Sequence, residues 1–348
     1  MERKKEKAGN ISYLTLKLTN RCNLNCAMCG QVFSPERFSK DELELDIINR
    51  ILEETPFVKQ VYLFGGEPLL YKELSELLEL LQKKNIMSRI TTNGTLLVKY
   101  AEDIVKYGVT NVEVSLDSHN KDVLSSIRGF DIYDLIIKGI EHLVDEKRKY
   151  NSQYPKININ CVVLPHNYKE LVEFVDHVRS HIQGVDSIYF QYPMITTQEQ
   201  GISQNKVTQK LFGMDSISWK WFNNPAQQFA DEEIRYIYNE LELLKHDPLA
   251  NFKNVSNYEE LERLLSPRYV KEEKVCECPF TALTIFPNGD ATFCTDFPDI
   301  VLGNVYRESL NNIWKGSNSQ RFREYLNVEG GFPICARCYH VDEKLMES

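Results

Sequence analysis

Short strand-like runs alternate with amphipathic helical stretches along the first half of this chain. The strand-like runs begin near Tyr13, Val61, Ser88, Asn111, Lys156 and Ser187, and the helical stretches cover Leu43–Glu53, Tyr71–Lys84, Leu97–Tyr107, Tyr133–Lys147 and Tyr168–Ile182. The helical stretches carry apolar residues three and four positions apart, whereas the strand-like runs are short and often alternate. Strand–helix units in series predict a parallel sheet whose strands are joined by crossover helices.

Three cysteines follow the first predicted strand at short spacing. Cys22, Cys26 and Cys29 form a C-x3-C-x2-C loop directly after the alternating run Tyr13–Leu18. Such a loop can turn three thiolates toward one point, one fewer than the four ligands of a cubane iron–sulfur cluster. An iron without a protein ligand can bind a small molecule, as the open position of a catalytic zinc binds water. Three zinc ligands or three reduced core cysteines are the alternatives that the triplet alone allows.

The second predicted strand ends in the run Phe64-Gly65-Gly66-Glu67-Pro68. Its two glycines permit a close backbone approach to a ligand. The carboxylate of Glu67 can accept a charge-assisted hydrogen bond from an ammonium group. This run therefore indicates a ligand site at the same end of the sheet as the cysteine loop.

Polar residues also end the third and fourth predicted strands. The run Asn111–Asp117 alternates, which places its apolar side chains on one face and Glu113, Ser115 and Asp117 on the other. The apolar face would pack under helices, and the polar face would meet a hydrated lumen. The run Thr91–Gly94 is by itself a turn signal.

Together these motifs resemble, in kind and in order, those of the radical S-adenosylmethionine (radical SAM) enzymes. The resemblance implies a partial (β/α)6 barrel, with the site built by loops at the carboxyl ends of the strands. It implies a 4Fe-4S cluster on Cys22, Cys26 and Cys29, whose remaining iron binds the amino and carboxylate groups of SAM. The residues that the family pattern assigns to SAM binding are Gly65, Gly66, Glu67, Asn93, Ser115, Asp117 and Arg128. Without the resemblance, Ser115 and Asp117 would be strand-end residues and Arg128 a surface cation at a helix end.

A second set of cysteines lies in the last quarter of the sequence. Pro287–Asp290 marks a hairpin turn between two strand-like halves, which brings Cys278 and Cys294 near one another. Cys335 and Cys338 form a C-x2-C pair whose sulfurs can reach one metal centre, and four thiolates complete a cubane cluster. A zinc ribbon is the alternative, because four cysteines on hairpins also suit structural zinc.

This region resembles the SPASM and twitch auxiliary-cluster domains of many radical SAM enzymes, including the segments Leu302–Val305 and Ser309–Trp314. No cysteine follows Cys338 in the sequence, so the shorter twitch type, with one auxiliary cluster, is the better match. The resemblance thus implies two 4Fe-4S clusters, one that binds SAM and one auxiliary. Cys276 and Cys278 compete for one ligand position, and Cys278 is favoured because the family often has Cys-Pro there. Cys276 would then be unused or would donate a hydrogen atom to a substrate radical.

The residues between the two motif regions differ in composition. The run Thr196–Lys210 is polar and rich in Gln, Asn and Ser, which is typical of a loop, and aromatic residues then gather within Phe212–Phe222. The aromatic residues either hold an insertion in place or belong to a segment that covers the substrate. Asp231–Lys245 and Tyr258–Leu265 are expected to be helical. The predicted parts of the chain are residues 1–193 (partial barrel), 194–274 (linker or insertion) and 275–348 (twitch-type domain).

Charge and cysteine use narrow the class of protein. The 348 residues carry a formal net charge of -9, whereas nucleic-acid binding usually leaves a basic footprint, so we expect no nucleic-acid partner. No stretch is long and apolar enough to span a bilayer, and the charged start Met1–Lys7 is not signal-like, so we expect a cytoplasmic protein without a membrane partner. Nine cysteines in an intracellular chain indicate metal ligands or thiols. Cys161, on the apolar face of a strand, is interpreted as a small buried hydrophobic residue.

The resemblance also implies the reaction. SAM bound to the reduced first cluster would yield a 5'-deoxyadenosyl radical that takes a hydrogen atom from the substrate, with a flavodoxin- or ferredoxin-type reductant. We expect a small polar substrate, such as a sugar, aminocyclitol or nucleoside, and an oxidoreductase- or epimerase-type enzyme that dehydrogenates or epimerises it. The short segment before Tyr13 leaves no room for the leader-peptide domain of many peptide-modifying relatives. Peptide maturation is the alternative enzymatic function, and a non-enzymatic iron–sulfur carrier or zinc protein is the third hypothesis.

Overall fold

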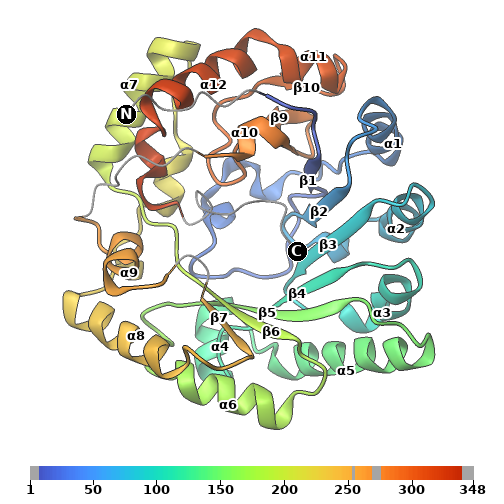
Figure 1. Ribbon diagram of the computed structural model, residues 1–348, viewed down its shortest axis with the longest axis vertical. Coiled ribbons are helices and arrows are strands. Elements are labelled where there is room, and N and C mark those ends of the chain that lie inside the picture. Colours follow the sequence, from blue (N-terminus) through green and yellow to red (C-terminus); the bar gives the residue numbers. More distant parts are fainter. Residues whose placement is uncertain (1–7, 253–254, 269–275, 339–348) are drawn as a thin grey trace.

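The computed structural model describes residues 8–252, 255–268 and 276–338. Within them one sheet runs in the order β10-β9-β8-β1-β2-β3-β4-β5-β6-β7. Its strands are β1 (Tyr13–Lys17), β2 (Gln60–Phe64), β3 (Met87–Thr92), β4 (Asn111–Ser115), β5 (Lys156–Val162), β6 (Ser187–Gln191), β7 (Ala250–Phe252), β8 (Ala282–Ile285), β9 (Asp290–Thr292) and β10 (Gly303–Asn304). The strands from β8 through β1 to β7 are parallel to one another. The sheet curves without closing (Figure 1), which confirms the predicted partial barrel.

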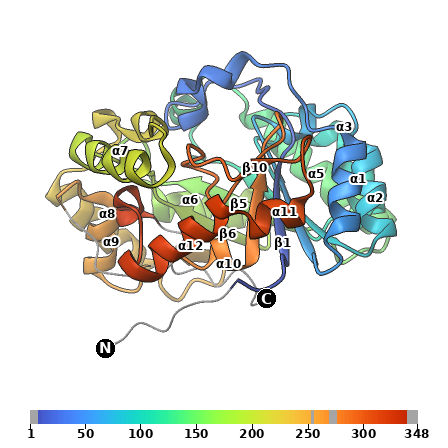
Figure 2. The same cartoon turned by 90° about the horizontal axis from the view of Figure 1, so that it is seen from above.

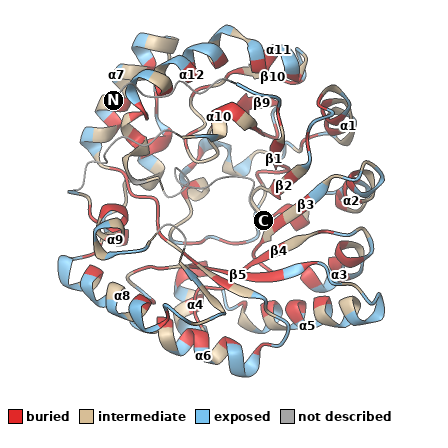
Figure 3. Ribbon diagram, in the orientation of Figure 1, coloured by how far each residue is buried: buried red, intermediate tan, exposed pale blue. Residues whose placement is uncertain are grey.

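Helices cover the outer face of the curved sheet. They are α1 (Leu45–Glu54), α2 (Leu74–Lys83), α3 (Leu97–Lys106), α5 (Tyr133–Lys149) and α6 (Leu171–His181), joined by the shorter α4 (Lys121–Arg128). Each carries a buried stripe toward the strands and an exposed outer face (Figure 3). The expected strands and crossover helices are thus confirmed, apart from α4, which the sequence analysis did not anticipate.

The parallel register brings the loops of the site to one end of the barrel. Lys17, the last residue of β1, pairs with Phe64, the last residue of β2. Because parallel strands point the same way, the segments that follow β1 and β2 leave the sheet together. Figure 2 shows the segment between β1 and α1, in blue, standing out at one end of the molecule.

The prediction of a loop over Thr196–Lys210 was wrong, because helix α7 spans Gln198–Phe212. Thr197 caps this helix through a capping box with Gln200, a local signal that the polar composition obscured. The helix buries Gly201 against the indole ring of Trp219, where a Cβ atom would lie only 2.1 Å away. A polar helix is therefore stable here because tertiary packing compensates for its weak apolar stripe.

In its described residues the rest of the middle region is mostly helical, apart from the short strand β7, and it leads to the C-terminal segment. It contains the 3-10 helices η4 (Ser218–Phe222) and η5 (Pro225–Gln227), and the helices α8 (Asp231–Leu243) and α9 (Tyr258–Leu265), both as expected. The C-terminal segment contains α10 (Cys278–Thr281), α11 (Leu310–Lys315), α12 (Ser317–Glu329) and the 3-10 helix η6 (Pro333–Arg337). The predicted hairpin is confirmed, since β8 and β9 pair antiparallel across the Pro287–Asp290 turn.

Strand β8 also pairs with β1, so the hairpin extends the barrel sheet rather than standing apart from it. The predicted bounds of the three parts stay a prediction, and residues 1–7, 269–275 and 339–348 lie outside the described residues. In the part of the chain that the structure describes, no helix has the length and apolar character needed to cross a bilayer.

Candidate active site

The cysteine loop starts at the carboxyl end of β1 and is tied to its surroundings by backbone hydrogen bonds. The amide of Ala27 donates to the carbonyl oxygen of Ile127 at 2.8 Å, and the amide of Cys29 donates to that of Cys26 at 3.2 Å. The side-chain amide of Gln227 donates to the Ala27 carbonyl at 3.1 Å. The loop is thus held both by α4 and by the middle region, which the sequence analysis had only suggested as a covering segment.

The two glycines of the second motif lie against the base of this loop. The amide of Gly66 donates to the carbonyl of Thr19, and the amide of Glu67 donates to that of Arg21, both at 2.8 Å. A Cβ atom on Gly66 would lie 2.1 Å from the Arg21 carbonyl oxygen, and one on Gly65 would lie 2.7 Å from the Thr19 oxygen. In this structure the two glycines therefore allow the backbone at Thr19 and Arg21 to approach closely.

Glu67 is fully buried and accepts three hydrogen bonds. One carboxylate oxygen accepts from the Leu69 amide at 3.0 Å and from the Thr92 hydroxyl at 2.6 Å, and the other accepts from the Asn93 amide at 2.8 Å. Burial raises the pKa of Glu67 to about 7, against these three donors, which act to lower it. A cation bound beside this carboxylate would favour its charged form, as the predicted SAM ammonium group requires.

Asn93 connects the third strand to the cysteine loop. Its side-chain amide donates to the side-chain oxygen of Asn23 at 2.8 Å, and its own side-chain oxygen accepts from the Thr95 amide at 3.0 Å. The structure thus brings Asn93 and Glu67 to the loop that carries the three cysteines. Their predicted contacts with SAM stay a prediction.

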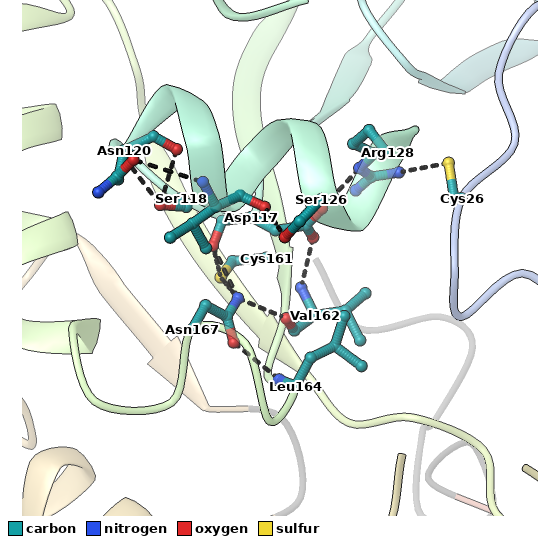
Figure 4. A network of polar contacts seen from close by, with 11 residues as sticks. Cys26, Asp117, Ser118, Asn120, Ser126, Arg128, Cys161, Val162, Leu164 and Asn167 are labelled. Atoms are coloured by element: carbon teal, nitrogen blue, oxygen red, sulfur yellow. Dashed lines mark hydrogen bonds and ion pairs between the residues drawn. The ribbon is translucent and has the colours of Figure 1, made fainter. Parts of the chain in front are cut away.

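Arg128 is a buried member of the site rather than a surface cation. Its Nε donates to an Asp117 carboxylate oxygen at 2.5 Å, and its Nη1 lies 3.8 Å from the sulfur of Cys26 (Figure 4). Both partners of the ion pair are buried, at 8% and 0% side-chain exposure. The other Asp117 oxygen accepts from the Val162 amide at 3.0 Å. Asp117 is therefore held by the protein on both oxygens, and its predicted contact with SAM stays a prediction.

The side chains on the lumen face of β4 are polar, as the alternation of the sequence predicted. Glu113 forms an ion pair with Arg89 and accepts from the Thr91 hydroxyl at 2.7 Å and from the Asn160 side-chain amide at 3.0 Å. Ser115 ends the strand and is half-buried. These polar side chains come from neighbouring strands and share the barrel interior, so the lumen is polar as expected.

The thiols of the first motif fit a metal cluster. Cys22 is exposed, Cys26 is buried and Cys29 is half-buried. Burial raises the pKa of the Cys26 thiol, although the neighbouring Arg128 guanidinium acts to lower it. A bound iron keeps a thiol deprotonated in such surroundings. Cys161 lies in the core at 0% exposure, in line with its interpretation as a buried hydrophobic residue.

The five C-terminal cysteines interact with one another. A hydrogen bond to the Cys276 thiol raises the pKa of Cys278, and burial raises the pKa values of Cys294 and Cys338, with further increases from neighbouring cysteines. The Cys335 thiol is among those neighbours. Because Cys276 and Cys278 both lie close to the others, the choice between them as the fourth ligand stays a prediction.

The cysteines of neither set are arranged around a single metal position in the described residues. Among the described residues, no three His, Cys, Asp or Glu side chains are arranged as the ligands of a single metal ion. In a cubane cluster each thiolate binds a different iron, so its ligands need not converge in this way. The Phe297 amide donates to the Cys294 sulfur at 3.4 Å, the kind of hydrogen bond that tunes an iron–sulfur centre.

A cavity of about 380 Å³ is lined by Cys29 of the first cysteine set and by Thr295 and Asp296, the two residues that follow Cys294 of the second set. One side is lined by Lys17, Cys29 and Gly65, and the other by residues of the hairpin and the loop after it, among them Thr292 and Asp296. The middle region contributes Ile217 and an aromatic wall formed by Trp221 and Phe222. The sequence analysis missed Lys17. Lys17 shares one face of β1 with Tyr13 and Thr15, and every residue of this strand is buried. A lysine in such a strand is the feature that could have pointed to it.

Two family models match the parts of the chain that carry the two cysteine sets. The family model of the radical SAM superfamily matches residues 16–178, and that of the SPASM iron–sulfur cluster-binding domain matches residues 276–339.

Curated relatives include a probable GTP 3',8-cyclase of Pyrococcus abyssi, 32% identical over 51% of this chain and 56% of the relative. The chain thus spans little more than half the length of that cyclase. Another relative, the tungsten-containing aldehyde ferredoxin oxidoreductase cofactor-modifying protein of Pyrococcus furiosus, is 28% identical over 94% of this chain and 87% of the relative.

Solved structures with the same fold include Streptococcus suis SuiB bound to the precursor peptide SuiA, with a TM-score of 0.64 at 18% identity over 90% of this chain and 67% of SuiB. Native anSMEcpe with bound S-adenosylmethionine and a peptide gives a TM-score of 0.63 at 17% identity over 97% of this chain and 92% of that protein. These similarities and the two family models account for the cysteine loop, the barrel and the hairpin together. The chain belongs to the radical SAM superfamily, as a radical SAM enzyme with a C-terminal SPASM-type domain, and its cofactors are SAM and 4Fe-4S clusters.

Proposed function

We propose that this enzyme dehydrogenates a small polar substrate bound in the cavity that Cys29 and Asp296 line. The observation that carries the proposal is the position of this cavity of about 380 Å³. Cys29 and Gly65, from the SAM side, line it together with Asp296, which lies close enough to raise the pKa of the Cys294 thiol. A substrate held there would lie beside Cys29 and beside Thr295 and Asp296, the two residues that follow Cys294.

The chain's own residues would prepare the site. Cys22, Cys26 and Cys29 would hold the first cluster, and Glu67 would accept a hydrogen bond from the ammonium group of SAM. When bound, these cofactors supply the 5'-deoxyadenosyl radical that takes the substrate hydrogen atom. The aromatic wall that includes Trp221 would keep water from the reacting carbon.

Dehydrogenation is favoured over thiol-assisted epimerisation by the place of Cys276. Its thiol interacts with Cys278, and Cys276 is not among the residues that line the cavity. A hydrogen atom could not pass directly from this thiol to a substrate held there. An electron could instead leave the substrate radical toward an auxiliary cluster on the nearby cysteines, while a proton leaves the same molecule, which balances a two-electron oxidation.

The charge of the lining supports a substrate unlike GTP, the nucleotide named for the cyclase relatives. Four carboxylates, those of Glu36, Asp290, Asp296 and Asp299, line the cavity, against the single ammonium group of Lys17. A triphosphate would bring several negative charges beside them, and like charges at short range repel. We therefore do not extend the cyclisation of GTP to this chain.

Peptide maturation is the second candidate, and an exposed apolar surface favours it. Phe33 and Phe38 flank cavity-lining residues of the segment after the cysteine loop and are 55% and 85% exposed, and Ile217 at the cavity is 45% exposed. An extended peptide could pack on such a surface while one residue enters the cavity.

The test starts with formation of 5'-deoxyadenosine by anaerobically reconstituted protein with SAM and dithionite. The matched control carries Cys22→Ala, Cys26→Ala and Cys29→Ala. We expect formation by the wild type and none by the control, since the control cannot hold the first cluster. Equal amounts from both would contradict the proposed enzyme activity.

A second comparison tests the role of the auxiliary cysteines. A Cys294→Ala, Cys335→Ala variant should still form 5'-deoxyadenosine but should lose oxidised product when candidate polyols, amino sugars and a short peptide are supplied. Product only from the peptide would favour maturation. Undiminished oxidation by the variant would contradict the proposed electron path.

A further inference from the structure

Lys17 is the cationic residue of the cavity, and it is nearly buried. It ends β1, five residues before the first cysteine of the loop, and is 8% exposed. Its side chain lines the cavity together with Cys29 and Gly65. A lysine in this position must bring a charged group out of bulk water, which is costly without a partner.

No hydrogen bond, and no ion pair within 4.0 Å, joins the ammonium group to a described residue, although the Glu36 carboxylate and the Cys29 thiol interact with it electrostatically at longer range. Its Nζ also lies 5.2 Å from the centroid of the Phe286 ring. A cation–π contact of this kind contributes only about 0.5–2 kcal/mol and leaves the three N–H donors free. By contrast, the buried guanidinium groups of Arg89 and Arg128 each pair with a carboxylate.

On the basis of the proposed function, we propose that Lys17 binds an anionic group of the substrate. An oxyanion placed in the cavity would supply the direct hydrogen-bond acceptor that Lys17 lacks among the described residues, in addition to the longer-range attraction of Glu36. It would also fix which end of the substrate lies beside Cys29, and therefore which carbon faces the SAM site. Lys17 is then a specificity-determining residue of the reaction.

The opposite wall limits the rest of the substrate. Asp299 accepts hydrogen bonds from Ser216, Ile217 and Ser218, and Asp290 accepts from Asn288 and Asn304. These carboxylates are held in place by hydrogen bonds. They would attract hydroxyl or ammonium donors and repel a second anionic group. The substrate class is therefore a small polyhydroxylated or aminated molecule with one carboxylate or similar anion, such as an amino sugar acid.

The test compares four probes that share one carbon skeleton: glucose, gluconate, glucosamine and glucosaminate. Their dissociation constants are measured by calorimetry with anaerobically reconstituted protein and SAM. For the wild type we expect gluconate to bind about tenfold more tightly than glucose, the effect of one good charge pair, and glucosaminate to bind at least as tightly as gluconate.

The variants are Lys17→Met, Lys17→Arg and the control Lys59→Met, which removes a lysine from an exposed position just before β2. We expect Lys17→Met to bind gluconate and glucose within about twofold of one another. Lys17→Arg and Lys59→Met should both keep the preference for the anion. If Lys17→Met fails to fold, Lys17→Gln carries the same expectation, and circular dichroism and iron content establish the folded state.

Three outcomes would overturn the inference. The wild type could bind gluconate no more tightly than glucose, Lys17→Met could keep the preference, or Lys17→Met could weaken SAM binding while leaving the preference unchanged. The last result would assign the ammonium group to SAM. None of these outcomes depends on turnover, so a failure of the proposed reaction would be seen separately, in the 5'-deoxyadenosine assay.

Discussion

The carboxyl group of Glu67 should make the stability of this protein depend on pH in a direction opposite to that of most acidic residues. The side chain is fully buried and accepts hydrogen bonds from Leu69, Thr92 and Asn93. In Glu67→Gln, the amide oxygen can replace one carboxylate oxygen, but the amide NH2 group then faces another donor. We expect that lost hydrogen bond to cost about 1–3 kcal/mol at every pH.

The pH-dependent part follows from the two pKa values of Glu67. Burial raises its pKa from 4.5 to about 7 in the folded protein. Between these values the folded protein keeps a proton that the unfolded chain has lost, so the free energy of unfolding decreases as the pH rises through this range. The whole decrease is about 3 kcal/mol, at about 1.36 kcal/mol per pKa unit, and roughly 2 kcal/mol of it falls between pH 5.5 and pH 8.

The assay is the thermal unfolding midpoint of the anaerobic protein at several pH values across that range. Other titrating groups are common to both proteins, so the difference between wild type and Glu67→Gln isolates this carboxyl group. We expect the advantage of the wild type to shrink by about 3 °C from pH 5.5 to pH 8, because a chain of 348 residues has a large unfolding entropy. A difference that stays constant with pH would refute the reasoning, and an infrared carboxyl band that titrates near pH 7 only in the wild type would support it.

Three further predictions concern the two cluster sites. Gly66→Ala would place a Cβ atom 2.1 Å from a carbonyl oxygen of the cysteine loop, so we expect the iron content to fall by about half through loss of the first cluster, and unchanged iron would contradict this. Arg128→Met leaves the Asp117 carboxylate buried without its partner, which should cost roughly 3–5 kcal/mol in urea unfolding. Adding Asp117→Asn should recover part of that loss, whereas equal losses in the single and double variants would argue against a stabilising ion pair. Cys278→Ser should lower the auxiliary iron content more than Cys276→Ser does, and the reverse result would assign the ligand position to Cys276.

The sequence by itself determined the architecture and the cofactors. Strand and helix periodicity act locally, so the six strands from β1 to β6 and their crossover helices could be placed from residue spacing alone. The cysteine triplet and Gly65-Gly66-Glu67 are also local patterns, and each follows a strand end, which predicts the edge of the sheet at which the cofactors would bind. The family models agree with this assignment at both ends of the chain.

Tertiary structure alone decided which groups meet. The polar run before Lys210 forms a helix because Gly201 packs on Trp219, a contact that no local pattern contains. Arg128 reaches both Asp117 and the sulfur of Cys26, across 102 residues of sequence. The charge of Lys17 becomes relevant to substrate binding only because β1 and the hairpin line the same cavity. Burial and the partners of a charged group depend on residues that are distant in sequence, and these two quantities set both its pKa and its chemical role.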